Sequence, residues 1–271
     1  MIVDSSERKE KRRELVLVVH EGPAKVARNT YRIRFEKPDG FTFAPGQSLK
    51  TNFKNEIRPD GNFRTPSFTI VSAPHEPFLE IVFRVKENEA DWSGTKRSLM
   101  ALTAGDEVPA LDVLREKLDE VVYPDDVSRD TPIVMLAAGV GIAPFISMMR
   151  HAAHVGDRRD VHLLYANPTY ADVAYGYEVD RFTHSLAPNL STQKFLTREP
   201  RAGFAHGYFD REYIRSIIAR SPRTFPIFFV SGSEGMVEAT VKLLESMHVP
   251  DSRIRVKRFK GYKGEDDTIR E

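Results

Sequence analysis

The sequence predicts two domains, an antiparallel β-barrel over residues 14–125 followed by an α/β domain with a parallel sheet over residues 130–262. Three observations support this fold class. The 271 residues are enough for two cores of ordinary size. As far as Val108, short β-rich segments alternate with turn residues, which is typical of antiparallel barrels. After Pro132, apolar strands, glycine turns and amphipathic helices alternate, which is typical of a parallel sheet covered by helices.

The barrel half begins after a charged lead, residues 1–13, which we interpret as a solvated segment or, alternatively, as a surface patch for a partner. Four clear strands follow, at residues 15–19, 30–35, 68–71 and 79–85. In the second strand, apolar and charged side chains alternate from Tyr31 to Phe35, as in a strand that is buried on one face. A helix is expected over residues 93–102, where a Gly-Asp turn follows it.

The second half contains continuous apolar runs, which indicate buried strands of a parallel sheet. These runs lie at residues 133–136, 161–165 and 227–230. The stretch Pro-Asp-Asp at residues 124–126 is the expected linker between the domains, and residues 263–271 are expected to form a C-terminal tail.

The composition argues against several functional classes. The formal net charge of +1 provides no sustained basic field, so we expect no nucleic-acid partner. No apolar run approaches the ~18 residues of a membrane span, and no signal-peptide pattern opens the chain, so a cytoplasmic location is expected. The chain has no cysteine, which excludes thiolate-bound iron–sulfur clusters and zinc sites. The histidines show no metal-ligand spacing, and we expect no metal.

Two glycine-containing loops follow predicted strands. Residues 137–145 contain Gly139 and Gly141 and open a helix at Pro144, so a ligand phosphate could approach the backbone and the helix N-terminus. Residues 229–236 form the second loop, again before a helix. In an open α/β sheet, loops at the carboxyl ends of two strands can share one ligand. The alternative interpretation is a pair of tight turns without a ligand.

The segment of residues 63–74 combines a cation, an aromatic ring and hydroxyl groups on one predicted strand of the barrel. An arginine such as Arg64 can neutralise a cofactor phosphate, and Phe68 can lie against a planar ring. The alternative is an ordinary edge strand with serine and threonine on its solvated face.

Six segments, in the order expected along the chain, resemble the ferredoxin-NADP reductase family. Residues 68–72 resemble its flavin motif, residues 138–144 its nucleotide loop, and residues 230–232 its Cys-Gly-Pro motif. Residues 43–47 and 99–108 resemble its Pro-Gly-Gln turn and its Leu-x-x-Leu-x-x-Gly-Asp-x-Val stretch, and residues 258–262 its closing Phe-x-Gly-Tyr. The resemblance implies an FAD-binding barrel and a Rossmann-like NAD(P)-binding domain.

The family's site residues transfer to positions in both domains. The resemblance implies FAD contacts from Arg64, Ser67, Phe68, Thr69, Phe83, Arg84, Val85, Thr95, Lys96 and Tyr262. It implies NAD(P) contacts from Gly139, Val140, Gly141, Ala143, Pro144, Asn167, Thr197, Arg198, Ser231, Gly232 and Met236. Thr69, near flavin N5, and Ser231, near the nicotinamide, are the implied catalytic residues.

Four features depart from the family pattern or leave alternatives open. Pro66 occupies the usual arginine position, so Arg64 either serves from two residues away or has no such role. Ser231 replaces the reactive-side cysteine of the family. Tyr262 either stacks on the flavin or closes the last strand, and the choice between NADH and NADPH stays open around Arg198, Glu199 and Arg201.

The predicted function is hydride transfer between NAD(P)H and FAD, followed by electron transfer to a separate carrier such as ferredoxin or flavodoxin. A non-catalytic or regulatory flavin- or nucleotide-binding subunit of a larger electron-transfer complex is the alternative. A nucleotide-binding module that has lost FAD is a third hypothesis.

Overall fold

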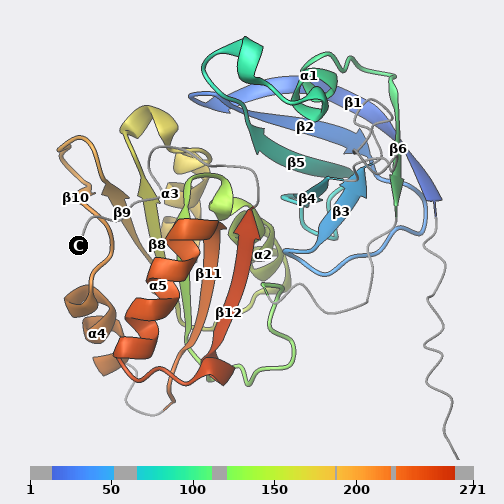
Figure 1. Cartoon of the computed structure of the whole chain (residues 1–271). Coiled ribbons are helices and arrows are strands. Elements are labelled where there is room, and N and C mark those ends of the chain that lie inside the picture. The colour runs from blue at the N-terminus through green and yellow to red at the C-terminus, as the bar shows by residue number, and fades with distance from the viewer. Residues whose placement is uncertain (1–13, 52–65, 112–120, 187, 221–223, 260–271) are drawn as a thin grey trace, which may run out of the picture.

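The computed structural model describes residues 14–51, 66–111, 121–186, 188–220 and 224–259. Two sheets lie one above the other in Figure 1, an antiparallel sheet from the first half of the chain and a parallel sheet from the second. This arrangement confirms the predicted barrel followed by a Rossmann-like domain. No helix within the described ranges has the length and apolar character needed to cross a membrane.

The first sheet has six strands in the order β4-β3-β6-β1-β2-β5. Their bounds are β1 Glu14–Ala27, β2 Thr30–Glu36, β3 Ser48–Thr51, β4 Ser67–Thr69, β5 Phe78–Arg84 and β6 Glu107–Leu111. An antiparallel bridge between Ile70 and Ile81 joins the two edge strands, so the sheet curls into a barrel. The predicted helix is α1, Gly94–Met100, and Ser93 caps it by accepting a hydrogen bond from the Lys96 amide.

The second sheet has six parallel strands in the order β10-β9-β8-β7-β11-β12. Their bounds are β7 Ile133–Ala138, β8 Val161–Asn167, β9 Leu190–Leu196, β10 Ala205–His206, β11 Ile227–Ser233 and β12 Ile254–Phe259. Four helices connect them, α2 Ala143–Val155, α3 Gly176–Ser185, α4 Arg211–Ala219 and α5 Glu234–Ser246. The order reverses at β7, from which the chain runs outward first to β8 and β9 and later to β11 and β12.

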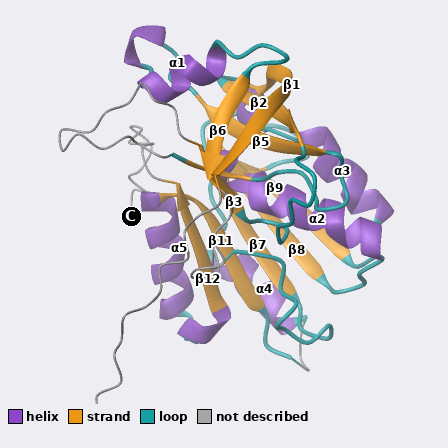
Figure 2. Cartoon of the chain, turned by 90° about the vertical axis from the view of Figure 1, so that its right-hand side faces the viewer, coloured by secondary structure: helices purple, strands orange, loops and turns teal. Residues whose placement is uncertain are grey.

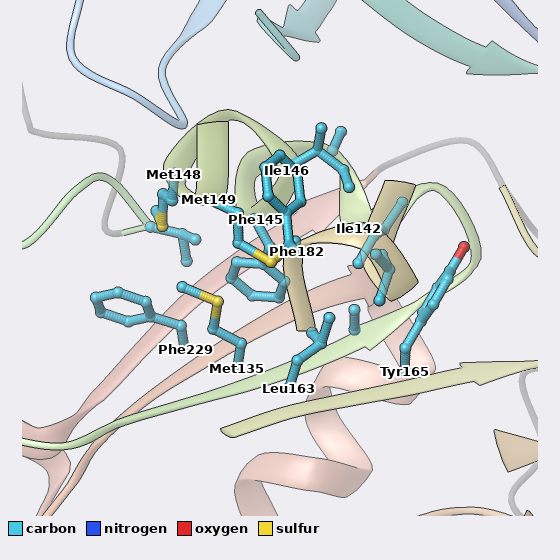
Figure 3. Close-up of a cluster of buried hydrophobic side chains, with 14 of the residues drawn as sticks. Met135, Ile142, Phe145, Ile146, Met148, Met149, Leu163, Tyr165, Phe182 and Phe229 are labelled. Atoms are coloured by element: carbon cyan, nitrogen blue, oxygen red, sulfur yellow. The ribbon is translucent and has the colours of Figure 1, made fainter. Parts of the chain in front are cut away.

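Both faces of this sheet are buried, which explains why its strands are continuous apolar runs. Along β7, Ile133 and Met135 pack under α2 and α3, whereas Val134 and Leu136 pack against α4 and α5. Figure 3 shows the first of these clusters, with Phe145 at its centre among side chains from α2, α3 and the sheet.

Strand β5 joins the two domains, because each of its faces is buried in a different core. Leu79, Ile81 and Phe83 belong to the barrel core. On the other face, Val82 packs into the core beneath α2, which includes Phe145 and Met149. Figure 2 shows the barrel lying directly over the parallel sheet in a second view. The two domains therefore share a continuous apolar interface rather than a bare linker.

A pair of histidines stacks across this interface. The ring of His75, in the turn before β5, lies 3.8 Å from that of His154 on α2, with the two planes 8° apart. Burial lowers the pKa of His75 below 6.5, and the positive charge of a protonated His154 lowers it further; Glu76 acts in the opposite direction, while Lys37 and Arg150 act in the same direction.

We expect the free energy of unfolding to fall as the pH drops below about 6.5. Below this pH, His75 gains a proton in the unfolded chain, whereas its lowered pKa keeps it unprotonated in the folded chain. The unfolded state therefore binds more protons, and the stability present at neutral pH is lost as the pH falls. Melting temperatures at several pH values measure this slope, and it should become shallower in His154→Gln. His206→Gln provides the control, because His206 is exposed on β10. Equal slopes in the wild type, His154→Gln and His206→Gln would contradict the prediction.

Candidate functional site

Two loops meet where the order of the parallel strands reverses. The chain leaves β7 through the 3₁₀ turn Gly139–Ile142, and the neighbouring strand β11 ends at Ser233, where α5 begins. Ligands of open α/β sheets bind beyond the carboxyl ends of strands at such a reversal. The structure thus brings together the two glycine segments that the sequence singled out.

Gly141 is the point at which the two loops touch. A Cβ atom on Gly141 would lie 2.1 Å from the backbone oxygen of Ser231 and 2.9 Å from Cα of Gly232. Gly139 differs, since its φ is +53° and no atom of the described residues lies within 4 Å of the place of a Cβ. The Tyr165 hydroxyl donates to the Gly139 oxygen at 3.1 Å and supports the turn from beneath. The turn therefore presents open backbone on one side and is tightly packed on the other.

Polar side chains without partners lie at the same strand ends. Ser231 is fully buried, and its hydroxyl makes no hydrogen bond with any described residue. Asn167, at the end of β8, is 2% exposed, and neither atom of its amide group has a partner among those residues. An unsatisfied buried polar group costs about 1–3 kcal/mol. Such groups fit a site whose ligand, such as a carboxamide, supplies the missing hydrogen bonds.

An aromatic surface with a cation lies on the barrel side. The Lys96 ammonium lies 5.5 Å from the ring centre of Phe68 and 4.9 Å from that of Phe83. Thr95, the neighbour of Lys96 on α1, is buried. Thr69 is also buried, with its hydroxyl 3.4 Å from that of Ser48. The group fits a planar ring system that carries phosphate, because the rings offer stacking surface and the ammonium offers charge.

The two groups adjoin the same strand, because β5 carries Phe83 on its barrel-core face and also lies against the turn Gly139–Ile142. A further link joins β12 to the barrel, where the Lys257 ammonium donates to the Gly46 oxygen at 2.8 Å. The glycine loops and the aromatic cluster are therefore brought close to one another through β5.

The remaining predicted residues lie at several places around the site or outside the described part of the chain. Pro144 is in the first turn of α2, and Ala143 and Met236 are buried close to the loops. Thr197 follows β9, and its backbone amide donates to the backbone oxygen of Asn167 at 3.0 Å. Ser67 is exposed. Val140 is the second residue of the turn Gly139–Ile142, and Val85 directly follows β5. Arg64 and Tyr262 lie outside the described residues.

Sequence reasoning missed the charged groups that join the domains. Glu80 on β5 is 1% exposed and accepts hydrogen bonds from Arg34 at 2.8 Å and from the Tyr175 hydroxyl at 2.9 Å. Arg150 of α2 approaches Glu80 at 3.4 Å and pairs with Glu178 at 2.7 Å. One signal was available, because a glutamate between Leu79 and Ile81 interrupts an apolar strand and needs a buried partner.

Comparison with known families covers the nucleotide half of the site. Residues 135–242 match the family model described as the oxidoreductase NAD-binding domain. The chain is 22% identical over 215 residues to NADH-cytochrome b5 reductase 2 of Aspergillus terreus, covering 78% of this chain and 64% of that protein. The chain spans 34% of the length of the flavohemoprotein of Bacillus subtilis, to which it is 25% identical over 138 residues, or 49% of this chain.

Solved structures share the whole fold. The flavohem-like FAD/NAD-binding domain of nitric oxide dioxygenase from Vibrio cholerae superposes with a TM-score of 0.74 at 17% identity, covering 90% of this chain and 98% of that one. A ferredoxin NADP+ reductase from Neisseria gonorrhoeae, with bound FAD and NADP, has a TM-score of 0.69 at 18% identity and covers 92% and 99%. The two-domain arrangement is therefore common to this chain and to these reductases.

Proposed function

We propose that this chain is an oxidoreductase of the ferredoxin-NADP reductase-like family, with FAD and a nicotinamide dinucleotide as cofactors, and that it passes electrons from NAD(P)H to a separate protein carrier; the matched NAD-binding domain and the shared two-domain fold support this. Ferredoxin and flavodoxin are the carriers that we propose, and the cytoplasm is the proposed location.

One observation carries the proposal: the nucleotide turn Gly139–Ile142 lies against the barrel strand that bears Phe83. Hydride transfer needs two rings in contact, and two ligands held by these elements would meet at the interface between the domains. Bound FAD supplies the redox chemistry, and the protein supplies orientation and a dry contact.

Individual residues have separate tasks in this proposal. Phe68 and Phe83 provide the surface for the flavin ring, with Lys96 placed for a phosphate. Gly139 allows the dinucleotide to approach the backbone of the turn, and Gly141 allows the turn to pack against the loop after β11. Ser231 and Asn167 offer unsatisfied hydrogen-bonding groups to the nicotinamide end. The Thr69 hydroxyl is proposed to hydrogen-bond the flavin near N5.

The proposal is tested with the purified chain loaded with FAD. We expect a yellow protein that binds one FAD and whose flavin absorbance is lost within seconds when NADH or NADPH is mixed in a stopped-flow instrument. A protein that stays colourless after FAD is added would sink the proposal. A flavoprotein that neither coenzyme reduces would instead indicate a non-catalytic subunit.

Ser231→Ala is expected to slow flavin reduction about tenfold, the cost of one lost hydrogen bond of ordinary strength. The melting temperature should not fall, because the buried hydroxyl has no partner among the described residues. Ser233→Ala provides the matched control: Ser233 caps α5 by accepting from the Met236 amide, so this change should lower stability and leave the rate alone. A destabilised Ser231→Ala with an unchanged rate would contradict the assignment.

Arg198→Ala is expected to raise KM for NADPH and leave KM for NADH unchanged. The Glu199 carboxylate accepts a hydrogen bond from the Tyr170 amide at 2.8 Å, and the Arg201 guanidinium lies 3.7 Å from the Tyr170 ring centre. We propose that the Arg198 guanidinium, which the family resemblance places at the coenzyme, pairs with a 2′-phosphate. Steady-state kinetics with both coenzymes measure the effect, Arg201→Ala is the comparison, and equal changes in both KM values would refute the assignment.

A further inference from the structure

One carboxylate of the nucleotide-binding domain holds two arginines of the barrel. Asp172, in the loop after β8, has a side chain that is 1% exposed. Arg28 donates to it at 2.6 and 3.1 Å, and Arg84, the last residue of β5, donates at 3.1 Å. Thr169 completes its shell with a hydroxyl bond at 2.8 Å and an amide bond at 3.1 Å. The cluster therefore crosses the domain interface with one carboxylate at its centre, and Arg28 adds bonds to the Thr169 hydroxyl at 3.2 Å and, through its amide, to the Ala171 oxygen at 2.7 Å.

The Asp172 carboxylate is ionised at neutral pH. Burial would raise the pKa of Asp172, but hydrogen bonds from Arg28 and Thr169 and the charge of Arg84 outweigh it, and the pKa lies below its usual range. Asp172 therefore stays ionised at neutral pH, and its attraction for both arginines persists.

On the barrel side, the cluster holds the end of the strand that we assign to the flavin. The side chain of Arg84 is bound by Asp172, and the next residue, Val85, donates its amide to the Asn29 oxygen at 2.8 Å. The preceding residue, Phe83, contributes the ring beneath Lys96. Residues 83–85 are thus held in part by a side chain of the other domain.

On the nucleotide side, the same loop is bonded to the residues that we assign to the coenzyme. Asn167 and Pro168 accept hydrogen bonds from the amides of Thr197 and Arg198, at 3.0 and 2.9 Å. The loop then continues directly to Thr169 and Asp172, where a capping box closes a short turn. A coenzyme that contacts Asn167 and Thr197 restrains this loop, and a restrained Asp172 favours the position of Arg84 seen here.

We propose that Asp172 is a positioning residue that couples the coenzyme loop to the flavin strand through Arg84, so that binding of the nicotinamide dinucleotide tightens binding of FAD. This inference rests on the proposed function and concerns the coupling between its two cofactor sites. Linkage requires that the effect be reciprocal, with FAD raising affinity for the dinucleotide by the same factor.

The test titrates apoprotein with FAD, by quenching of flavin fluorescence, with and without saturating NAD+ or NADP+. Oxidised coenzyme prevents turnover, so the readout is an affinity and not an activity. We expect the wild type to bind FAD about fivefold or more tightly when coenzyme is present. In Arg84→Ala that ratio should fall to about one, while Asp172 retains Arg28 and Thr169 and the fold is kept.

Two further variants make the result specific. Asp172→Asn should also abolish the ratio, whereas Asp180→Asn, which breaks an ion pair with Lys194 inside one domain, should preserve it. A wild-type ratio of one, or a ratio unchanged in Arg84→Ala, overturns the inference while the flavin reductase proposal stands. Failure of the wild type to bind FAD at all overturns both.

Discussion

Replacing Gly141 with alanine is expected to lower the rate of flavin reduction by NAD(P)H about 100-fold, because hydride transfer tolerates little displacement of the two rings. The added methyl group would lie 2.1 Å from the Ser231 oxygen and 2.9 Å from Cα of Gly232. Both neighbours are backbone atoms, so the loops after β7 and β11 must separate. Stopped-flow reduction measures the rate, and FAD binding to the barrel should persist.

Gly156→Ala is the matched control for this change. Gly156 ends α2 with φ of +65° and has no atom within 4 Å of a Cβ position, so alanine meets strain but no clash. We expect a loss of about 1–2 kcal/mol in stability from this strain, comparable with the ~1–3 kcal/mol of overpacking at Gly141. Only Gly141→Ala should slow hydride transfer, and equal slowing in both would show that lost stability is the cause.

Replacing Arg150 with alanine is expected to lower the free energy of unfolding by about 3–5 kcal/mol, the usual cost of breaking a buried ion pair. The side chain of Arg150 is 12% exposed and contacts carboxylates from both domains, at 2.7 Å from Glu178 and 3.4 Å from Glu76 and Glu80. Glu80 is 1% exposed and would lose one of its cationic partners. Chemical denaturation measures the loss.

Arg150→Met distinguishes charge from packing, since methionine keeps most of the apolar stem. Both variants should be destabilised to a similar extent if the unpaired carboxylates are the cause. Asp126→Asn is the surface control, because Asp126 is 66% exposed where it pairs with Arg255, and exposed pairs contribute at most about 1 kcal/mol. A stable Arg150→Met would assign the effect to packing and contradict the electrostatic explanation.

Much of the fold was predictable, because the two halves have different periodicities. Alternation from Tyr31 to Phe35 matches β2, where Ile33 and Phe35 are buried. The apolar runs at residues 133–136, 161–165 and 227–230 are β7, β8 and β11. Strand β1 extends to Ala27, well beyond the predicted residues 15–19, because bulges let it pair with β2 through a polar stretch. The domain limits at 125 and 130 stay a prediction.

The site was predictable to the extent that its chemistry lies in short segments. Glycines at the ends of apolar strands indicated the nucleotide loops, and the resemblance indicated Phe68, Phe83 and Lys96, which lie together in the structure. Glu80 and Arg150 are 70 residues apart in the chain, and Asp172 and Arg84 are 88 apart. No local pattern specifies such pairs, because each depends on how one domain packs upon the other.

The sequence alone therefore determined two domains, their strand types and the two glycine-containing loops at strand ends, since these follow from local periodicity and backbone sterics. Tertiary structure alone decided that Gly141 touches Ser231, that β5 is buried on both faces, and that Asp172 and Glu80 hold arginines across the interface. Long-range electrostatics and burial depend on distances in space, which a linear pattern of residues does not contain.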